Sequence, residues 1–458
     1  MYQFIILISS LAIFWILRKL IFYKYYTYIF FVVCIFVPFI PLVIFALTNI
    51  WIFEDYTFWT NELFDPNNSL KVLKHLSLIY LVVSLACIVP LINLKKLFSN
   101  GFLSFNFVKQ KDILKKNKSN YKSTYKINLF SQYLILFFVV LISILSICFG
   151  YSTETILKQS YDDVLSTSTY SDRNTAVTTL LFYLQSILVY STCLFGLSLN
   201  KKSTKFFGNI IILITLFWAV FVDLSQGDRT SFGFIISLIS ITLYFNKIKG
   251  SNHPFSLSPK TAISIFSIVI SLAYFLGVVR VVGYQTMINS PYTVLKLAGS
   301  YTVLALPSNS GFRQLIGQAI YFDGIDFTDA FNLINSHLML IFPSFLRNII
   351  GYDSSLGFYD TNLYKSFTNG GSNLTILPFE IGGYLLVFAV VFLFCYSILF
   401  FEKKLEKTNG IFYLVVLVLF ISFTPRLAWN GYGYLAKFVS LIIPVFFIIR
   451  LMFNKKIT

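Results

Sequence analysis

Two acids and an arginine occupy one very short connection between two long apolar stretches. The segment Asp223-Leu-Ser-Gln-Gly-Asp-Arg-Thr230 contains Asp223, Asp228 and Arg229, and Gly227 allows it to reverse tightly. The connection predicts a turn, with Arg229 at the N-terminus of the next helix. A guanidinium beside a positive helix end suits a diphosphate or carboxylate ligand. The alternative is an ion pair of Arg229 with Asp223 or Asp228 that only holds the turn.

Two more arginines stand at the ends of apolar stretches. Arg280 ends the stretch Tyr274-Phe-Leu-Gly-Val-Val-Arg280, and Arg426 lies in Thr424-Pro-Arg-Leu-Ala-Trp-Asn430, which predicts another short turn. Each alone is explained by a side chain that reaches from a helix end to the membrane interface. Together with Arg229 they predict a shared site for an anionic group. All three are expected on the extracytoplasmic side of a membrane, where loops normally contain few basic residues.

A long segment, 281–377, adds further charged residues. It is too apolar for a disordered linker, and proline and glycine interrupt it too often for a single helix. We therefore expect short helices that lie on the outer face and partly re-enter it. Glu380 follows at the outer end of the next helix, where it is either a catalytic carboxylate or the ion-pair partner of an arginine. The charged residues that enter the hypothesis below are Arg313, Arg347, Asp360 and Lys365.

The elements that position these groups are predicted to be membrane-spanning helices. Apolar residues make up 57% of the 458 residues and charged residues 12%, whereas a soluble domain has about 25% charged residues. The apolar runs have the length needed to cross the hydrocarbon core. The prediction is a single all-α integral membrane domain, 1–458, a polytopic bundle of about eleven helices with a long, partly helical extracytoplasmic loop. The helices are expected near 2–17, 26–51, 72–93, 128–149, 175–199, 206–223, 231–245, 261–280, 378–400, 410–424 and 435–452.

The charge distribution orients this bundle. The net charge of +17 could indicate a nucleic-acid partner, but about two thirds of the 36 Lys and Arg residues fall in alternate loops and the C-terminal tail. Those segments contain only three of the 19 acids, Asp112, Glu402 and Glu406. By the positive-inside rule they are cytoplasmic, which places the N-terminus outside and the C-terminus inside and excludes nucleic acid as a partner. The loops are 18–25, 94–127, 200–205, 246–260 and 402–409.

The basic loop 94–127 is the longest of these cytoplasmic loops. Its lysines either orient the protein or face anionic lipids.

Several kinds of chemistry lack their usual signatures. The chain has no Walker motif, no GxGxxG and no GxSxG, so we expect no nucleotide cofactor and no serine-hydrolase activity. We also expect no metal site, because no cluster of metal ligands exists, and His75 and His253 are interpreted as loop or interface residues. The five cysteines lie within apolar runs and are interpreted as lipid-facing or core residues: Cys34, Cys87, Cys148, Cys193 and Cys395.

Several segments, taken in order over about residues 206–452, resemble the bacterial oligosaccharide repeat-unit polymerases, often called Wzy. They are the Gly-Asp-Arg229 turn, Phe342-Pro-Ser-Phe345, the glycine-rich stretch that runs into Thr375-Ile-Leu-Pro-Phe-Glu-Ile-Gly-Gly-Tyr384, and Pro425-Arg426. This family includes the O-antigen and enterobacterial common antigen polymerases. The first 200 residues match only in being transmembrane, and the chain lacks the histidine that some members have between Gly370 and Asn373.

The resemblance implies a glycosyltransferase at the outer face of the bacterial cytoplasmic (inner) membrane. A glycan on undecaprenyl diphosphate would be transferred to the terminal hydroxyl of another lipid-linked repeat unit, building O-antigen of lipopolysaccharide, capsule or a related polysaccharide. Membrane lipids, a chain-length regulator and a flippase are the implied partners. The implied site assigns Arg229, Arg280, Arg426, Arg347 and Arg313 to diphosphate, Asp228, Glu380 or Asp223 to the base, and Trp429, Tyr432, Lys365 and Asp360 to the glycan.

Two alternatives remain at this point. A flippase or transporter for lipid-linked oligosaccharide or polysaccharide would show charges deep in many helices and an internal repeat, and neither is visible. An O-antigen ligase-like transferase would differ only in its acceptor. Trp429 and Tyr432 also have an alternative role in an aromatic belt at the membrane interface.

Overall fold

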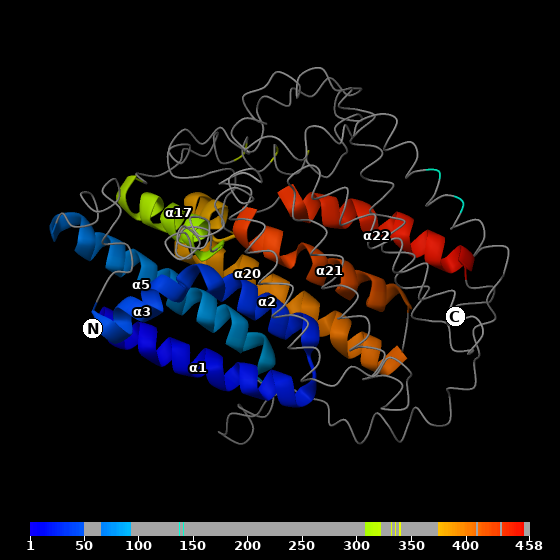
Figure 1. The fold of residues 1–458 in the computed structure, drawn as a ribbon, viewed down its shortest axis with the longest axis horizontal. Coiled ribbons are helices and arrows are strands. Elements are labelled where there is room, and N and C mark those ends of the chain that lie inside the picture. The colour runs from blue at the N-terminus through cyan, green and yellow to red at the C-terminus, as the bar shows by residue number, and fades with distance from the viewer. Residues whose placement is uncertain are drawn as a thin grey trace, which may run out of the picture.

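The fold is known from a computed structural model that describes residues 1–49, 66–92, 307–321, 374–408, 411–430 and 433–452, with five single positions besides. Within these ranges every assigned element is a helix, and the helices pack into one bundle (Figure 1). The predicted helical class is therefore confirmed for the described part of the chain.

The N-terminal half contributes three long helical rods. Helix α1, Tyr2–Tyr23, ends at Lys24, whose left-handed backbone turns the chain into α2, Tyr26–Phe36. A short 3-10 turn, η1 at Val37–Phe39, separates α2 from α3, Ile40–Thr48, because Pro38 and Pro41 interrupt the regular hydrogen bonding. Helix α5, Pro66–Ile88, continues into the 3-10 turn η2, Val89–Leu91.

Four helices of the C-terminal half complete the bundle. They are α17, Pro307–Tyr321, α20, Ile376–Thr408, α21, Ile411–Asn430, and α22, Gly433–Met452. Helix α20 contains a kink at Gly382 and Gly383 that divides it into a short first part and a long second part.

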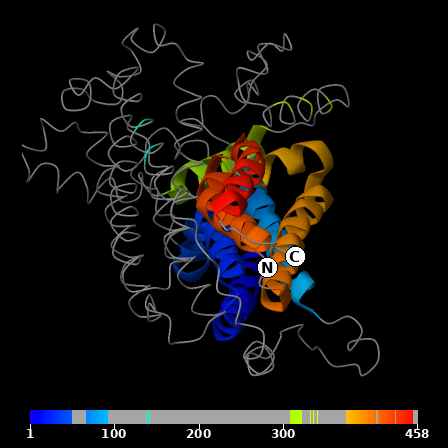
Figure 2. The same cartoon turned by 90° about the vertical axis from the view of Figure 1, so that its right-hand side faces the viewer.

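The two halves of the chain interlock. Helix α5 packs between α1 and α20, and α2 packs against α21 (Figures 1 and 2). In the core, Phe31 of α2 contacts Phe394 and Phe420, with ring centroids 5.9 and 5.7 Å away. Burial of these large rings and of the aliphatic side chains around them joins helices that are hundreds of residues apart in sequence.

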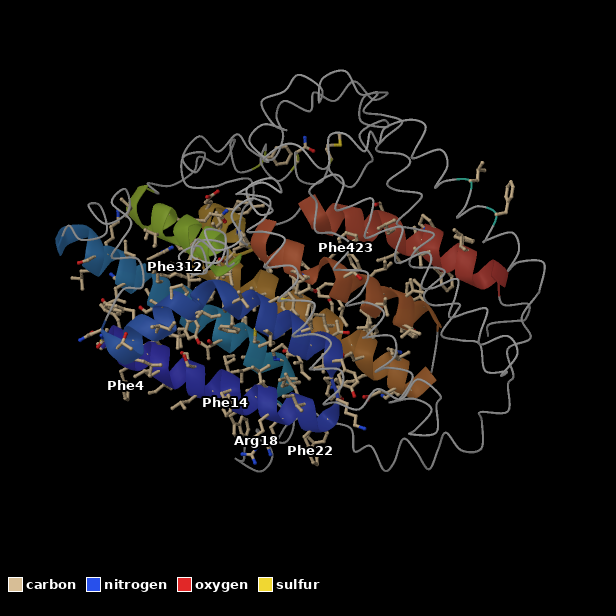
Figure 3. The ribbon with its side chains drawn as sticks, viewed as in Figure 1. Phe4, Phe14, Arg18, Phe22, Phe312 and Phe423 are labelled. Atoms are coloured by element: carbon tan, nitrogen blue, oxygen red, sulfur yellow. The ribbon has the colours of Figure 1, made fainter. Side chains whose placement is uncertain are left out.

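Helix α17 enters this bundle rather than lying on top of it. It contacts α5, η1 in the middle of the bent α2–α3 rod, and α21. Its residues from Gln314 to Ala319 are buried, as is Phe312 (Figure 3). The segment 281–377 thus contains at least one short helix, and its expected place at the outer face stays a prediction.

Long apolar helices dominate the described residues. Four are long and apolar enough to cross a membrane, and shorter apolar helices cover Phe412–Pro425 and Phe438–Ile448. The side of α1 that points away from the bundle exposes aromatic rings, among them Phe4, Phe14 and Phe22 (Figure 3), as is typical of a helix that faces lipid. The four long spans are Tyr2–Tyr23, Tyr26–Thr48, Ser69–Leu91 and Ile376–Lys407.

Two of the predicted basic loops lie close together in the bundle. Backbone N–H of Thr27 binds the carboxylate of Glu402, so the predicted loops 18–25 and 402–409 lie at one end of the bundle. The side chains of Gln3 and Asn49 are hydrogen bonded at the opposite end, where α1 begins and α3 has ended (Figure 1). Which end faces the cytoplasm stays a prediction.

The predicted helix boundaries need correction at their charged ends. The helix expected at 2–17 continues to Tyr23, and the one expected at 378–400 continues to Thr408, because Lys, Arg and Glu are good helix formers whose charged ends reach past an apolar stretch. The predicted spans 128–149, 175–199, 206–223, 231–245 and 261–280 and the loop 94–127 lie outside the continuous stretches that the structure describes, so the count of eleven stays a prediction.

Candidate functional site

The break in α20 shapes the start of this helix around Glu380. Gly383 has φ 61° and ψ −155°, a backbone conformation that residues with a Cβ atom rarely adopt. A Cβ atom added to Gly382 would lie 2.8 Å from the Cβ atom of Leu386. Both glycines therefore permit a sharp break, and the six residues before it, 376–381, form a separate helical turn that carries Glu380.

Glu380 is buried, with 7% of its surface exposed. The neighbouring Phe379 packs edge-on against the ring of His75, at a centroid distance of 4.6 Å. Phe379 also contacts the ring of Tyr384 at 4.9 Å. The candidate base is thus held in a turn that aromatic packing fixes against α5.

His75 of α5 joins three helices through hydrogen bonds. Its Nδ1 lies 3.1 Å from the hydroxyl oxygen of Tyr384 in α20, and its Nε2 lies 3.3 Å from Oε1 of Gln318 in α17. The Nε2 of Gln318 in turn donates to the carbonyl oxygen of Ile376, at 3.1 Å. These four residues come from segments separated by up to 309 positions in sequence.

The donors and acceptors in this chain are complementary. The amide nitrogen of Gln318 donates to the carbonyl oxygen of Ile376, so the amide oxygen of Gln318 faces His75. This oxygen accepts a hydrogen bond from the Nε2–H group of His75. An imidazole that is neutral and donates from Nε2 has its lone pair at Nδ1, where it accepts from the Tyr384 hydroxyl. The bonds therefore run in one direction, from Tyr384 through His75 and Gln318 to the backbone of Ile376.

The C-terminus of α17 is fixed at the same end of the bundle. Lys71, one turn before His75 on α5, donates from Nζ to the carbonyl oxygen of Ile320 at 3.1 Å. A cation at the C-terminal end of a helix satisfies a carbonyl that has no partner within the helix and favours the helix dipole. Lys71 and His75, which are one turn apart on α5, thus both anchor the last turn of α17.

This position corrects the interpretation of His75 as a loop or interface residue. It is buried inside α5, with its ring enclosed by Phe379 and Tyr384. The signal in the sequence was the occurrence of a histidine within an apolar helix, since polar side chains in such helices usually face the interior and have a partner.

The structure also corrects the local setting of Arg426. The segment 424–430 was expected to be a turn, but α21 continues through Pro425 to Asn430, so Arg426 and Trp429 belong to the last two turns of a helix. Proline is tolerated there because neighbouring groups in a bundle can satisfy the freed carbonyl.

The other predicted site residues divide into two groups. Arg313 lies on α17, and the structure describes its backbone but not its side chain, as for Arg426 and Trp429. The remaining residues lie outside the described stretches: Asp223, Asp228, Arg229, Arg280, Arg347, Asp360, Lys365 and Tyr432.

The described residues contain no group of three His, Cys, Asp or Glu side chains that could hold a metal ion. Cys34, Cys87 and Cys395 are buried and free, which decides for the core between the two positions, lipid-facing or core, that were expected of them. Cys148 and Cys193 lie outside the described ranges.

Comparison of the chain with known proteins finds no similar protein. No family model matches the chain, and the searches of curated proteins and of solved structures find no similar one.

Proposed function

We propose that the chain is a membrane glycosyltransferase that polymerises undecaprenyl-diphosphate-linked oligosaccharide repeat units at the outer face of the bacterial cytoplasmic membrane. The observation that carries the proposal is the convergence of elements around α17. Helix α17 bears Arg313 and contacts both α21, which bears Arg426, and α20, which bears Glu380. Three of the predicted diphosphate and base residues thus belong to neighbouring helices, although they are up to 113 positions apart.

The proposed reaction needs a base and an electrostatic clamp. The acceptor hydroxyl attacks the anomeric carbon of the donor glycan, its proton passes to a carboxylate, and the bond to the diphosphate oxygen breaks. Undecaprenyl diphosphate leaves with its negative charge, which guanidinium groups stabilise more than an acid would. Glu380 has the setting expected of the base, because it is shielded from bulk water beside a fixed turn. The arginines at helix ends are assigned to the diphosphate.

The orientation of the protein belongs to the same proposal. We place the end of the bundle that holds His75 and Glu380 outside and the end that holds Glu402 in the cytoplasm. The support is that the basic residues at the end of α1 and in the α1–α2 connection lie at the same end of the bundle as those of α20, as positive-inside topology requires.

The proposal is tested with Arg229→Ala and Arg426→Ala in a strain that depends on this protein for its surface polysaccharide. Both variants should leave single repeat units on the lipid carrier, and the glycan ladder on a gel should disappear. Arg18→Ala is the matched control, because Arg18 is an exposed arginine in the last turns of α1 (Figure 3). Normal ladders from both site variants would refute the assignment.

The same strain separates the alternatives. Repeat units that accumulate on the cytoplasmic leaflet would indicate a flippase. Full-length polymer that stays on the lipid carrier would indicate a ligase.

A further inference from the structure

The six-residue helical turn that carries Glu380 depends on contacts with other helices for its position. It precedes the break at Gly382 and Gly383, so the regular helical backbone of the long part of α20 does not extend into it. A helix of this length is not stable alone, because its few hydrogen bonds do not offset the free energy needed to nucleate a helix. Contacts with other helices must therefore set where Glu380 lies.

One residue pair contacts both sides of the break. Gln318 binds the carbonyl oxygen of Ile376, the first residue of the turn, at 3.1 Å. His75 binds the hydroxyl of Tyr384, the first residue after the break, at 3.1 Å, and its ring supports Phe379 within the turn. Because His75 and Gln318 also bind each other at 3.3 Å, they act as a bridge across the two glycines.

We propose that His75 is a positioning residue for Glu380: it couples α17 to both sides of the break in α20 and so holds the carboxylate in place for glycosyl transfer. The inference rests on the proposed function, since it takes Glu380 as the base. His75 is assigned no contact with the substrate. Its effect on the reaction passes through Gln318, Tyr384 and the turn 376–381.

The first measurement is kinetic and uses purified full-length protein in lipid nanodiscs with lipid-linked repeat units from a strain that lacks the protein. Tyr384→Phe removes only the hydroxyl and should lower kcat about tenfold, since displacement of a reacting group by about 1 Å can cost on the order of 100-fold. His75→Phe keeps an aromatic ring but loses both hydrogen bonds and should lower kcat by about 100-fold. KM should change little in either variant, because neither residue binds substrate.

A double variant tests whether the two residues act as one unit. His75→Phe with Tyr384→Phe should be no slower than His75→Phe alone, because the hydroxyl acts only through the imidazole. Tyr396→Phe is the matched control, as it removes a hydroxyl from an exposed tyrosine farther along α20. Additive losses, a rise in KM with unchanged kcat, or an active His75→Phe protein with normal kcat would overturn the positioning role.

The second measurement does not depend on activity. Hydrogen–deuterium exchange should become faster over residues 376–384 in His75→Phe and Gln318→Leu, with no change over the rest of α20. Unchanged exchange in this stretch would overturn the coupling whatever reaction the protein performs. An inactive wild-type protein in which exchange still depends on His75 would instead overturn glycosyl transfer and leave the coupling between α17 and α20 standing.

Discussion

The two ends of α20 both bury carboxylates, but they do so in opposite ways. At one end Glu380 sits in a short turn before a glycine break, and side chains from α5 and α17 hold that turn. At the other end Glu402 and Glu406 lie in the long second part of α20, which continues without a break to Thr408. The Oε1 atom of Glu402 accepts a hydrogen bond from the backbone N–H of Thr27 at 2.8 Å.

The difference separates a structural acid from a candidate functional one. Glu402 supplies an acceptor for the first turn of α2, where backbone N–H groups have no partner within their own helix, and its charge favours the positive end of that helix. Glu380 lies just before the helix break at Gly382 and Gly383, in a turn that side chains of other helices hold in place. This contrast is the reason why the proposal takes Glu380, and not Glu402, as the base.

The largest effect should come from neutralising the two acids in turn. Glu380→Gln keeps the shape of the side chain but removes the base, so the polymerisation rate should fall by a factor on the order of 100 to 10,000. Glu402→Gln keeps an oxygen acceptor for Thr27 and should retain most of the activity. Rates are measured on equal amounts of folded protein, and similar losses in the two variants would erase the proposed contrast.

The second effect concerns the break itself. Gly383→Ala forces a residue with a Cβ atom into the conformation at φ 61°, which should lower the free energy of unfolding by about 1–3 kcal/mol. No heavy atom lies within 4 Å of the new Cβ position, so the loss would arise from the backbone alone. Thermal unfolding in detergent measures it, with the exposed neighbour Leu385→Ala as the control. Equal melting temperatures would argue for a continuous helix.

A smaller effect is expected at the other end of α20. Glu402→Ala removes the acceptor for the N–H of Thr27 and should cost about 1–2 kcal/mol, as loss of a helix cap does. Glu402→Gln should cost less, and the two melting temperatures are compared in the same detergent. If the alanine and glutamine variants were equally stable, the capping role of Glu402 would be wrong.

The smallest effect on function is expected in the middle of α20. The sulfur atoms of Cys87 in α5 and Cys395 in α20 lie 3.8 Å apart and are both buried. Iodine should oxidise the two thiols to a disulfide, with release of two iodide ions and two protons, because the sulfur atoms need to approach only to about 2.05 Å.

The disulfide is detected as a linked peptide pair by mass spectrometry, and activity should change little because the helices already pack there. Cys395→Ser should abolish the link, and Cys34→Ser should preserve it. Absence of the disulfide in the wild-type protein would contradict the packing of α5 against the middle of α20.

The helices themselves could be predicted because their apolar runs match the thickness of a bilayer, as for 2–17 and 26–51. The boundaries were less accurate where charged residues extend a helix beyond its apolar stretch, as at Lys403 and Lys407, and where Pro425 was interpreted as a turn.

Part of the candidate site could also be predicted. Glu380 was recognised because an acid at the end of an apolar helix is costly and needs a reason. The bridge of His75, Gln318 and Tyr384 was missed, because no local pattern pairs residues 243 and 309 positions apart on three helices. Such contacts follow from the packing of the bundle and not from periodicity within one helix.

The deep position of α17 also sets an order for biogenesis. Its buried glutamines and its 15-residue length make it a poor substrate for direct insertion into lipid. Its partners include the carbonyl of Ile376, which the ribosome adds 58 residues after Gln318. Helix α17 can pack on α5 and η1 once it is synthesised, but its contacts are completed only after α20 has been added, so the last contacts of this helix form late in maturation.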